Sequence, residues 1–204
     1  MPTATMTHDD VRAHYGEPSI RARAKQLTRL DQHARAFIAL SPFLVIASSD
    51  KEGRGDATPR GDAPGFVAVL DDTTILVPDR PGNRRVDTML NLVENPRVGL
   101  LFLVPGINET LRINGPARFT HDMDLLKPLA VNGKDPVAGL LIETEEVYFH
   151  CGKALIRSHL WDQDAKVERS RFPSLGRILA DQVGGTGVAE SERSIEEGYR
   201  TKLY

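Results

Sequence analysis

Residues 66–104 read FVAVLDDTTILVPDRPGNRRVDTMLNLVENPRVGLLFLV, and this stretch decides the fold class. Two strand-like runs, Phe66–Leu70 and Thr74–Val77, are separated by a turn at Asp71–Asp72. A segment of helical period, Arg85 to Val93, follows and precedes a continuous apolar run from Val98 to Val104. Strands this close in sequence favour an antiparallel meander, because parallel neighbours need a crossover of about a dozen residues.

The flanking sequence extends the same pattern in both directions. Further strands are expected at Phe43–Ser48, Asp56–Arg60, Glu109–Phe119 and Ala138–His150. Gly115–Pro116 interrupts the third of these and suggests a bulge. At least six mostly antiparallel strands with one inserted helix predict a mainly β fold, a small closed β-barrel with flanking helices.

Helical signals dominate the two ends of the chain. Thr7, Ser19 and Asp31 are expected to cap helices in the first forty residues, and Leu175 to Val183 has the pattern of a helix before a charged tail. A short helix is also expected between Cys151 and Trp161. We therefore divide the chain into an N-terminal helical segment packed on the barrel (1–40), the barrel domain (41–161) and a C-terminal helical extension (162–204).

Composition excludes several classes of protein. The chain has 204 residues, a formal net charge of −2 and one cysteine, so an intrachain disulfide is impossible and no overall basic field favours nucleic acid. No apolar run reaches the roughly 20 residues that cross a bilayer, and the polar first residues lack a secretory signal. We expect a cytoplasmic protein that binds neither nucleic acid nor membrane.

A phosphate site is suggested where the central strand–loop–helix segment turns. Asn83, Arg84 and Arg85 lie at the expected helix start, where free backbone N–H groups and the helix dipole favour anions. Two guanidinium groups there would strengthen a site for a phosphate dianion. The alternative is a solvated arginine pair with Asn83 as an ordinary helix cap.

A second candidate is the segment that contains Pro59. A proline within a strand requires an edge or irregular position, which leaves main-chain groups free to bond a flat ring with polar edges. The alternative is that Arg60–Gly61–Asp62 forms a hairpin turn with an exposed ion pair. An integrin-type recognition role for this tripeptide would need extracellular display, which nothing in the sequence supports.

The segment from His150 to Trp161 could carry chemistry of a third kind. Neighbouring His150 and Cys151 would point to opposite faces of a strand, and no other His or Cys has zinc-like spacing, so we expect no metal site. Lys153 and Arg157 are four residues apart and could face an anion or a flavin edge, or could equally lie on a solvated helix. The sequence establishes neither a base nor a lowered pKa for Cys151 as a nucleophile.

Several motifs, taken in order, resemble a known family. They are T-P-R-G-D (58–62), G-F-V-A-V-L-D-D (65–72), P-D-R-P-G-N-R-R-V-D (78–87), E-N-P-R-V-G-L-L-F-L-V-P-G (94–106), E-T-L-R-I-N-G-P-A (109–117) and H-C-G-K-A-L-I-R-S-H-L-W (150–161). The chain is similar from about Leu27 to Trp161 to the pyridoxamine 5′-phosphate oxidase-like proteins, in particular their probable FMN-dependent branch of unknown substrate. The resemblance implies an FMN-binding split barrel that forms a homodimer with flavin at the interface.

The resemblance also implies which residues bind FMN. Residues matching the strand along the flavin ring are Asp56, Thr58, Pro59 and Arg60, and those matching the phosphate contacts are Val77, Pro78, Asp79, Asn83, Arg84 and Arg85. Thr110 matches a polar residue that reaches the flavin of the second subunit. Lys153 and Ser158 are placed near that interface.

One departure from the family pattern bears on the reaction. The oxidases proper close with an Arg- and His-containing segment that grips the substrate phosphate, whereas this chain ends Tyr199–Tyr204 without it. We therefore expect an FMN-dependent oxidoreductase that acts on an unidentified small molecule rather than on vitamin B6. The alternatives are a flavin carrier or sensor without turnover, and a split barrel that binds deazaflavin or haem.

Overall fold

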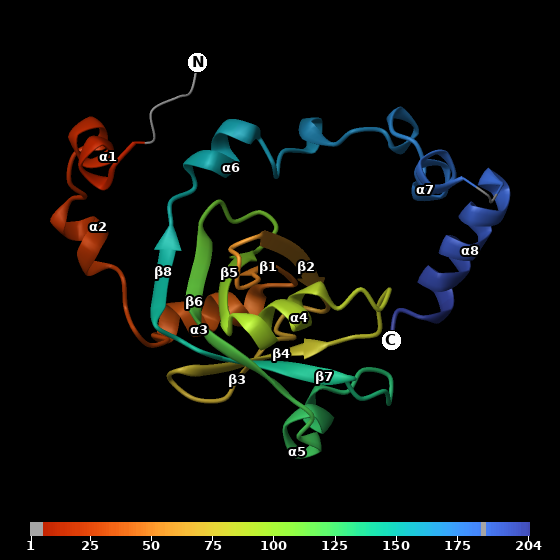
Figure 1. Ribbon diagram of the computed structural model, residues 1–204, viewed down its shortest axis with the longest axis horizontal. Coiled ribbons are helices and arrows are strands. Elements are labelled where there is room, and N and C mark those ends of the chain that lie inside the picture. The colour runs from red at the N-terminus through yellow and green to blue at the C-terminus, as the bar shows by residue number, and fades with distance from the viewer. Residues whose placement is uncertain (1–5, 185–186) are drawn as a thin grey trace.

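The computed structural model describes residues 6–184 and 187–204 (Figure 1). In chain order the elements are α1 (His8–Tyr15), α2 (Ile20–Ala24), α3 (Gln32–Leu40), β1 (Phe43–Ser49), β2 (Gly55–Gly61), β3 (Ala68–Val69), β4 (Thr74–Asp79), α4 (Asp87–Glu94), β5 (Arg97–Leu103), β6 (Thr110–Thr120), α5 (Met123–Leu126), the 3₁₀ turn η1 (Lys127–Leu129), β7 (Ala138–Glu143), β8 (Glu146–His150), α6 (Lys153–Ser158), the 3₁₀ turns η2 (Gln163–Ala165) and η3 (Arg169–Arg171), α7 (Leu175–Val183) and α8 (Val188–Thr201). The prediction of a mainly β fold with flanking helices is confirmed.

The strands form one continuous sheet with two regions that share β6. The order is β2-β1-β5-β6-β7-β4-β3, and β8 pairs with β6 beside this path. Every strand pairing among the described residues is antiparallel. The prediction of a simple meander is wrong, because β2 and β3 are not paired. Strand β4 pairs with β3 on one side and with the distant β7 on the other. Long-range pairing, rather than sequence adjacency, therefore sets the topology.

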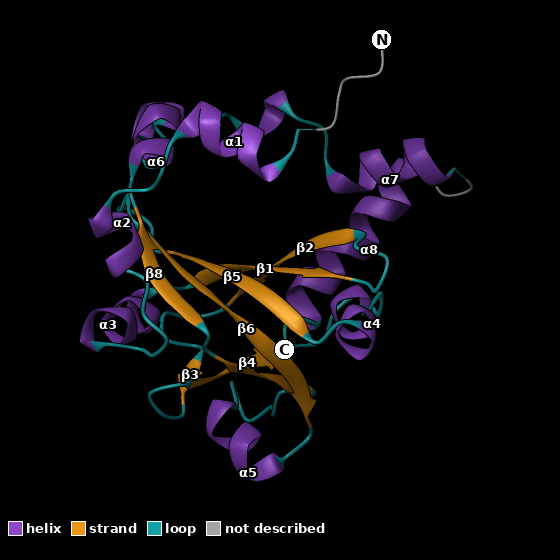
Figure 2. Ribbon diagram, turned by 60° about the vertical axis from the view of Figure 1, so that its left-hand side comes forward, coloured by secondary structure: helices purple, strands orange, loops and turns teal. Residues whose placement is uncertain are grey.

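Strand β6 passes from one sheet region to the other at Gly115 and Pro116. Its first half pairs with β5 and β8, and from Ala117 onward it pairs with β7. A Cβ atom at Gly115 would lie 1.9 Å from the Glu143 carbonyl oxygen, so only glycine allows this close approach. The register with β5 is continuous up to Pro116 and β6 is an unbroken strand (Figure 2), so the expected bulge is wrong.

The closed barrel that we expected is wrong, because the sheet stays open. Strands β2 and β3 lie at the two ends of the strand order and are not neighbours in it. Strand β3 spans only two residues, and Pro59 in β2 has no N–H to donate to a further strand. The opening between β2 and the β3–β4 hairpin is called the seam below.

The core lies between the two sheet regions and is closed at its sides by helices. Strands β1, β5 and β6 contribute fully buried Leu44, Phe102 and Leu111, and α3 adds Phe37 and Ile38. Figure 2 shows α3 and α4 at opposite sides of the sheet. Burial explains only half of the apolar run in β5, because Val98, Leu100 and Phe102 are buried whereas Leu101 and Leu103, on the other face, are partly exposed.

The expected helix caps are confirmed. The side chains of Thr7, Ser19 and Asp31 accept backbone N–H groups at the starts of α1, α2 and α3. Of these three helices only α3 has buried residues.

Three boundaries differ from the prediction. Residues 138–150 form two strands, β7 and β8, because Thr144 and Glu145 break the expected single strand. The inserted helix begins at Asp87 rather than Arg85. The charged tail folds as a separate helix, α8, which has no buried residue. Within residues 6–184 and 187–204, none of the helices combines the length and apolar character that spanning a bilayer demands.

Candidate functional site

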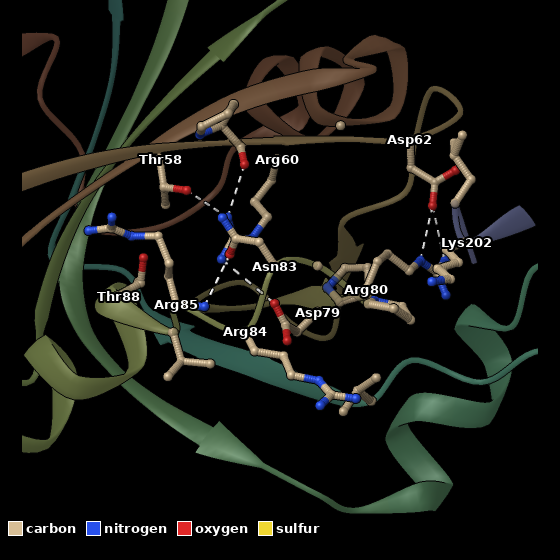
Figure 3. Close-up of a pocket in the computed structure, with 18 of the residues that line it drawn as sticks. Thr58, Arg60, Asp62, Asp79, Arg80, Asn83, Arg84, Arg85, Thr88 and Lys202 are labelled. Atoms are coloured by element: carbon tan, nitrogen blue, oxygen red, sulfur yellow. Dashed lines mark hydrogen bonds and ion pairs between the residues drawn. The ribbon is translucent and has the colours of Figure 1, made fainter. Parts of the chain in front are cut away.

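A cavity of about 1220 Å³ opens at the seam. It is lined by β2, the end of β4, the loop that enters α4, and the α7–α8 region (Figure 3). The structure brings together the predicted residues Asp56, Thr58, Pro59, Arg60, Pro78, Asp79, Asn83, Arg84 and Arg85 in its lining. These residues come from three separate segments of the sequence, so the fold itself assembles the site.

Arg60 lies in the middle of the cavity, on β2, which is an edge strand as Pro59 predicts. Its Nη1 donates to Thr58 Oγ1 and to the Pro59 carbonyl, both at 2.9 Å, and its Nη2 lies 3.6 Å from Asp79 Oδ1. Arg60 Nε is buried and has no hydrogen-bond partner among the described residues. A buried donor without a partner is costly, so this atom is available to a ligand.

Asp79 carries the other half of this pair from the end of β4. Burial raises the pKa of Asp79, and the positive charge of Arg60 opposes that rise only in part. The Asp79–Arg60 pair joins β4 to β2 across the seam by side chains, where a closed barrel would have a backbone ladder.

A second pair crosses the seam beside the first. Asp62, whose side chain is 3% exposed, accepts from Arg80 Nε at 3.1 Å, and Arg80 Nη2 also donates to the Leu129 carbonyl. The Tyr204 hydroxyl donates to the other Asp62 oxygen at 2.8 Å. Arg60–Gly61–Asp62 is therefore not a hairpin turn with its own exposed ion pair, because each charged side chain has its partner on or just after β4.

The loop between β4 and α4 has strained backbone at two non-glycine positions. Arg84 and Val86 have φ values of 63° and 51°, and a β-branched residue such as Val86 rarely adopts this region. Asn83 Oδ1 accepts from the Arg85 N–H at 3.1 Å, so Asn83 stabilises the loop and does not cap the helix. Val86 occupies the cap position, with no side-chain hydrogen bond to the first turn of α4. Strain of this kind is often found at ligand-binding loops.

The two loop arginines do not form a single cradle. Their side chains point to opposite sides of the loop in Figure 3. Arg85 Nε donates to Asp87 Oδ2 at 2.7 Å, and this contact raises the pKa of Arg85. Among the described residues Arg84 has no side-chain hydrogen bond or ion pair, so its charge is the uncompensated one. The alternative prediction was a solvated arginine pair with Asn83 as the helix cap. Both arginine side chains are exposed as it requires, but Asn83 does not cap α4 and Arg85 is paired with Asp87.

The remaining predicted residues lie away from this cavity. Val77 is fully buried in the core, and Thr110 is buried at the start of β6. Lys153 and Ser158 lie at the two ends of α6, where Ser158 Oγ donates to the Leu155 carbonyl. Cys151 is exposed just before this helix. Within the described ranges no three His, Cys, Asp or Glu side chains gather as a metal site would require.

Sequence reasoning missed Asp62, Arg80 and Tyr204 as site residues. A signal for the first two is present: Arg60 and Asp62 flank Gly61, and Asp79 and Arg80 follow in the reverse charge order. When two such segments lie side by side, the arginine of each can pair with the aspartate of the other. The contact of Tyr204 joins residues 142 positions apart, which no local pattern reveals.

Residues 30–151 match the family model described as pyridoxamine 5′-phosphate oxidase. This range covers more than half of the 204 residues. The chain belongs to the pyridoxamine 5′-phosphate oxidase family. The family match includes β2, β4, the arginine loop and α4, and it ends before α6, α7 and α8. The α7–α8 wall of the cavity therefore lies outside the part matched to the family.

Solved structures with related folds were also found. HupZ of Group A Streptococcus is 17% identical over 59% of this chain and 93% of that chain, with a TM-score of 0.49. A protein named F420 reductase is 13% identical over 59% and 98%, with a TM-score of 0.43. HutZ, the heme storage protein from Vibrio cholerae, is 13% identical over 60% and 94%, with a TM-score of 0.39. None of the curated proteins compared with the chain matches it.

Proposed function

We propose that the cavity at the seam binds FMN and that the protein is an FMN-dependent oxidoreductase acting on a small molecule. The observation that carries this proposal is the convergence of nine predicted flavin contacts in one cavity, and one of them, Arg84, has no ion pair among the described residues. Membership of the pyridoxamine 5′-phosphate oxidase family supports a flavin as the cofactor class.

The phosphate of FMN would lie at the loop before α4. Arg84 offers an uncompensated guanidinium group, and the first turn of α4 has no side-chain cap to occupy its backbone N–H groups. Thr88, in that first turn, lines the cavity and is almost fully buried. Arg85 contributes less than Arg84, because Asp87 already neutralises it.

The flavin ring would lie along β2. The outer edge of this strand carries main-chain groups with no neighbouring strand, and Arg60 Nε is a buried donor in need of an acceptor. When bound, FMN would supply the redox chemistry, while these residues bind it and orient it. The positive charge of Arg60 would favour negative charge on the part of the ring that it contacts.

We propose that the protein acts as a homodimer, with Thr110, Lys153 and Ser158 near the flavin of the partner subunit. Support comes from their position at β6 and α6, away from the cavity of their own chain. The outer face of the sheet is also unusually apolar, since Val45, Leu101 and Leu103 remain partly exposed in neighbouring strands. Such a face is typical of a protein interface.

The experiment combines a visible spectrum of the purified protein, its mass by analytical ultracentrifugation, and titrations with FMN and riboflavin. We expect a flavin spectrum, a dimer mass and much tighter binding of FMN than of riboflavin. The double variant Arg84→Ala/Arg85→Ala should lose FMN affinity roughly 100-fold or more and retain riboflavin affinity, because charge-assisted bonds to phosphate are lost.

A matched control is Arg21→Ala/Arg171→Ala, which removes the same charge from exposed positions outside the cavity. It should bind FMN like the wild type. If the loop double variant keeps full FMN affinity, the phosphate assignment is wrong. A monomer that binds FMN fully would contradict the dimer.

A flavin carrier or sensor without turnover is the second candidate. The observation in its favour is that no His, Cys or Glu is found among the described residues that line the cavity. Stopped-flow reduction by NADH or NADPH, followed by oxygen or a quinone, distinguishes the two functions. The same visible spectrum identifies a deazaflavin or a haem in place of FMN.

A further inference from the structure

The C-terminal part of the chain forms one wall of the cavity. Leu175 of α7, Ile195 and Tyr199 of α8, and residues 202–204 all belong to the lining. Figure 1 shows α6, α7 and α8 running in an arc around the sheets, with the end of the chain returning towards β4. This wall comes from outside the family-matched range.

The wall is a helical hairpin with few ties to the rest of the molecule. Helix α8 packs on α7, where a Cβ atom at Gly176 would lie 2.7 Å from the Glu192 backbone nitrogen, and the Ser174 hydroxyl bonds to Glu192. Helix α8 itself contributes no buried residue. The hairpin is therefore held together internally but covers the cavity without a core of its own.

Tyr204 provides the polar ties between this wall and the sheets. Its hydroxyl donates to Asp62 Oδ1 at 2.8 Å, and Lys134 Nζ donates to its main-chain oxygen at 2.8 Å. Apart from the bond between Ser174, which caps α7, and Glu192, these two are the hydrogen bonds that join residues 187–204 to the rest of the described chain. The Tyr204 ring also lies 5.5 Å from the Arg80 guanidinium carbon, within reach of a cation–π contact.

The receiving site for Tyr204 is rigid, which makes the contact specific. Asp62 is held by Arg80 and nearly fully buried, so its second oxygen is fixed in position before Tyr204 arrives. The bond to this carboxylate raises the pKa of Tyr204, because the protonated phenol is the form that donates to Asp62. In contrast, Tyr199 on the same wall makes no hydrogen bond to the sheets in the described structure.

We propose that residues 188–204 are a movable cover of the cavity and that Tyr204, seated on Asp62 and Arg80, is the latch that holds it closed. The inference rests on the proposed function, in that the ligand covered is FMN. Release of Tyr204 from Asp62 opens the cavity, so the latch governs how fast FMN enters and leaves. Tyr204 is accordingly a positioning residue and does not contact the reacting atoms.

The test measures FMN association and dissociation by stopped-flow fluorescence, together with tryptic cleavage at Arg193 and Arg200 of the full chain. Tyr204→Ala should accelerate both rates roughly 10-fold, since it removes a bond to a charged group, and leave the equilibrium affinity within about threefold. Cleavage in α8 should accelerate in parallel. Tyr204→Phe keeps the ring over Arg80 and removes only the hydroxyl, so it should give an intermediate acceleration.

Tyr15→Ala is the matched control, because it removes the same type of side chain from an exposed position on α1 that lies outside the cavity lining and far in sequence from both cleavage sites. Its cleavage rate should equal that of the wild type. If Tyr204→Ala leaves cleavage and both FMN rates unchanged, the latch is wrong. If it slows association or weakens affinity with unchanged cleavage, Tyr204 is a ligand contact and the cover is again wrong. A wild type that binds no FMN overturns the proposed function, and the cleavage comparison still decides on the latch.

Discussion

Arg60 and Arg80, on the strand side of the cavity, each pair with an aspartate from the opposite edge of the seam, whereas Arg84 and Arg85 lie exposed on the loop side. The strand-side pairs are largely buried, with side-chain exposures of 20% and 18% for Arg60 and Asp79, and 15% and 3% for Arg80 and Asp62. On the loop side, Arg85 is paired with an exposed aspartate, and Arg84 has no partner within the part of the chain that the structure describes. Strand-side arginines thus hold the seam together, whereas on the loop side Arg84 keeps a charge that can attract an anion and Arg85 is already paired with Asp87.

This division has a physical basis. A buried charge must be paired, and removing its partner leaves an uncompensated ion in a region of low dielectric constant. An exposed charge is solvated and screened, so it contributes little to the stability of the fold but attracts ligands of opposite sign. The same residue type therefore serves two purposes within one cavity.

The largest expected effect distinguishes the two sides by stability. Arg80→Ala should lower the free energy of unfolding by about 3 kcal/mol, because it leaves the buried Asp62 carboxylate without its ion-pair partner, with the neutral Tyr204 hydroxyl and the Ala63 backbone N–H as its donors. Arg84→Ala, four positions later, should change it by less than about 0.5 kcal/mol. Urea denaturation measures the free energy of unfolding of both variants. Equal decreases would show that the strand-side and loop-side arginines do not differ in their contribution to stability.

An intermediate effect separates the two loop arginines. Arg84→Ala should weaken FMN binding roughly 30-fold, and Arg85→Ala only about fivefold, because Asp87 already compensates Arg85. Fluorescence titration with FMN measures both, and riboflavin, which lacks the phosphate, should not distinguish them. A larger loss in Arg85→Ala would mean that ligand binding displaces Asp87 and reverses the ranking.

The smallest effect is a gain. Asp87→Asn removes a negative charge from the loop side and frees Arg85, so it should tighten FMN binding by about threefold at low ionic strength. The gain should shrink in about 0.5 M salt, where exposed charges are screened. An unchanged or weaker affinity at low salt would show that Asp87 is needed to shape the loop.

Much of the fold can be predicted because it depends on local patterns. The bounds of α7 agree with the prediction, and the caps of α1, α2 and α3 follow from single side chains. The open seam could not be predicted, because it results from the short β3 and from pairing between β4 and β7, more than fifty positions apart. The approximate extent of β6 was predicted. Its change of pairing from β5 to β7 next to Gly115 was not, because it involves the close approach of the Glu143 carbonyl, which is distant in sequence.

The candidate site divides in the same way. Local sequence indicated the loop arginines and the proline-containing strand, because helix starts and edge strands have local signatures. The reciprocal pairs Arg60–Asp79 and Asp62–Arg80 are tertiary, as is the contact of Tyr204, and these required the structure. The opposite directions of the Arg84 and Arg85 side chains (Figure 3) and the positive φ of Arg84 are likewise features of the folded loop that adjacency in the sequence does not reveal.

Strand β6 belongs to both sheet regions, and this has a mechanical consequence for the seam. A ligand that moves β2 away from β4 would rotate one sheet region relative to the other. The rotation would take place about β6, near Gly115. The Glu143 oxygen packed against this glycine leaves little clearance there, so the joint is stiff. The close contact at Gly115, outside the cavity lining, thus limits how far the seam can widen, in addition to the ion pairs that cross it.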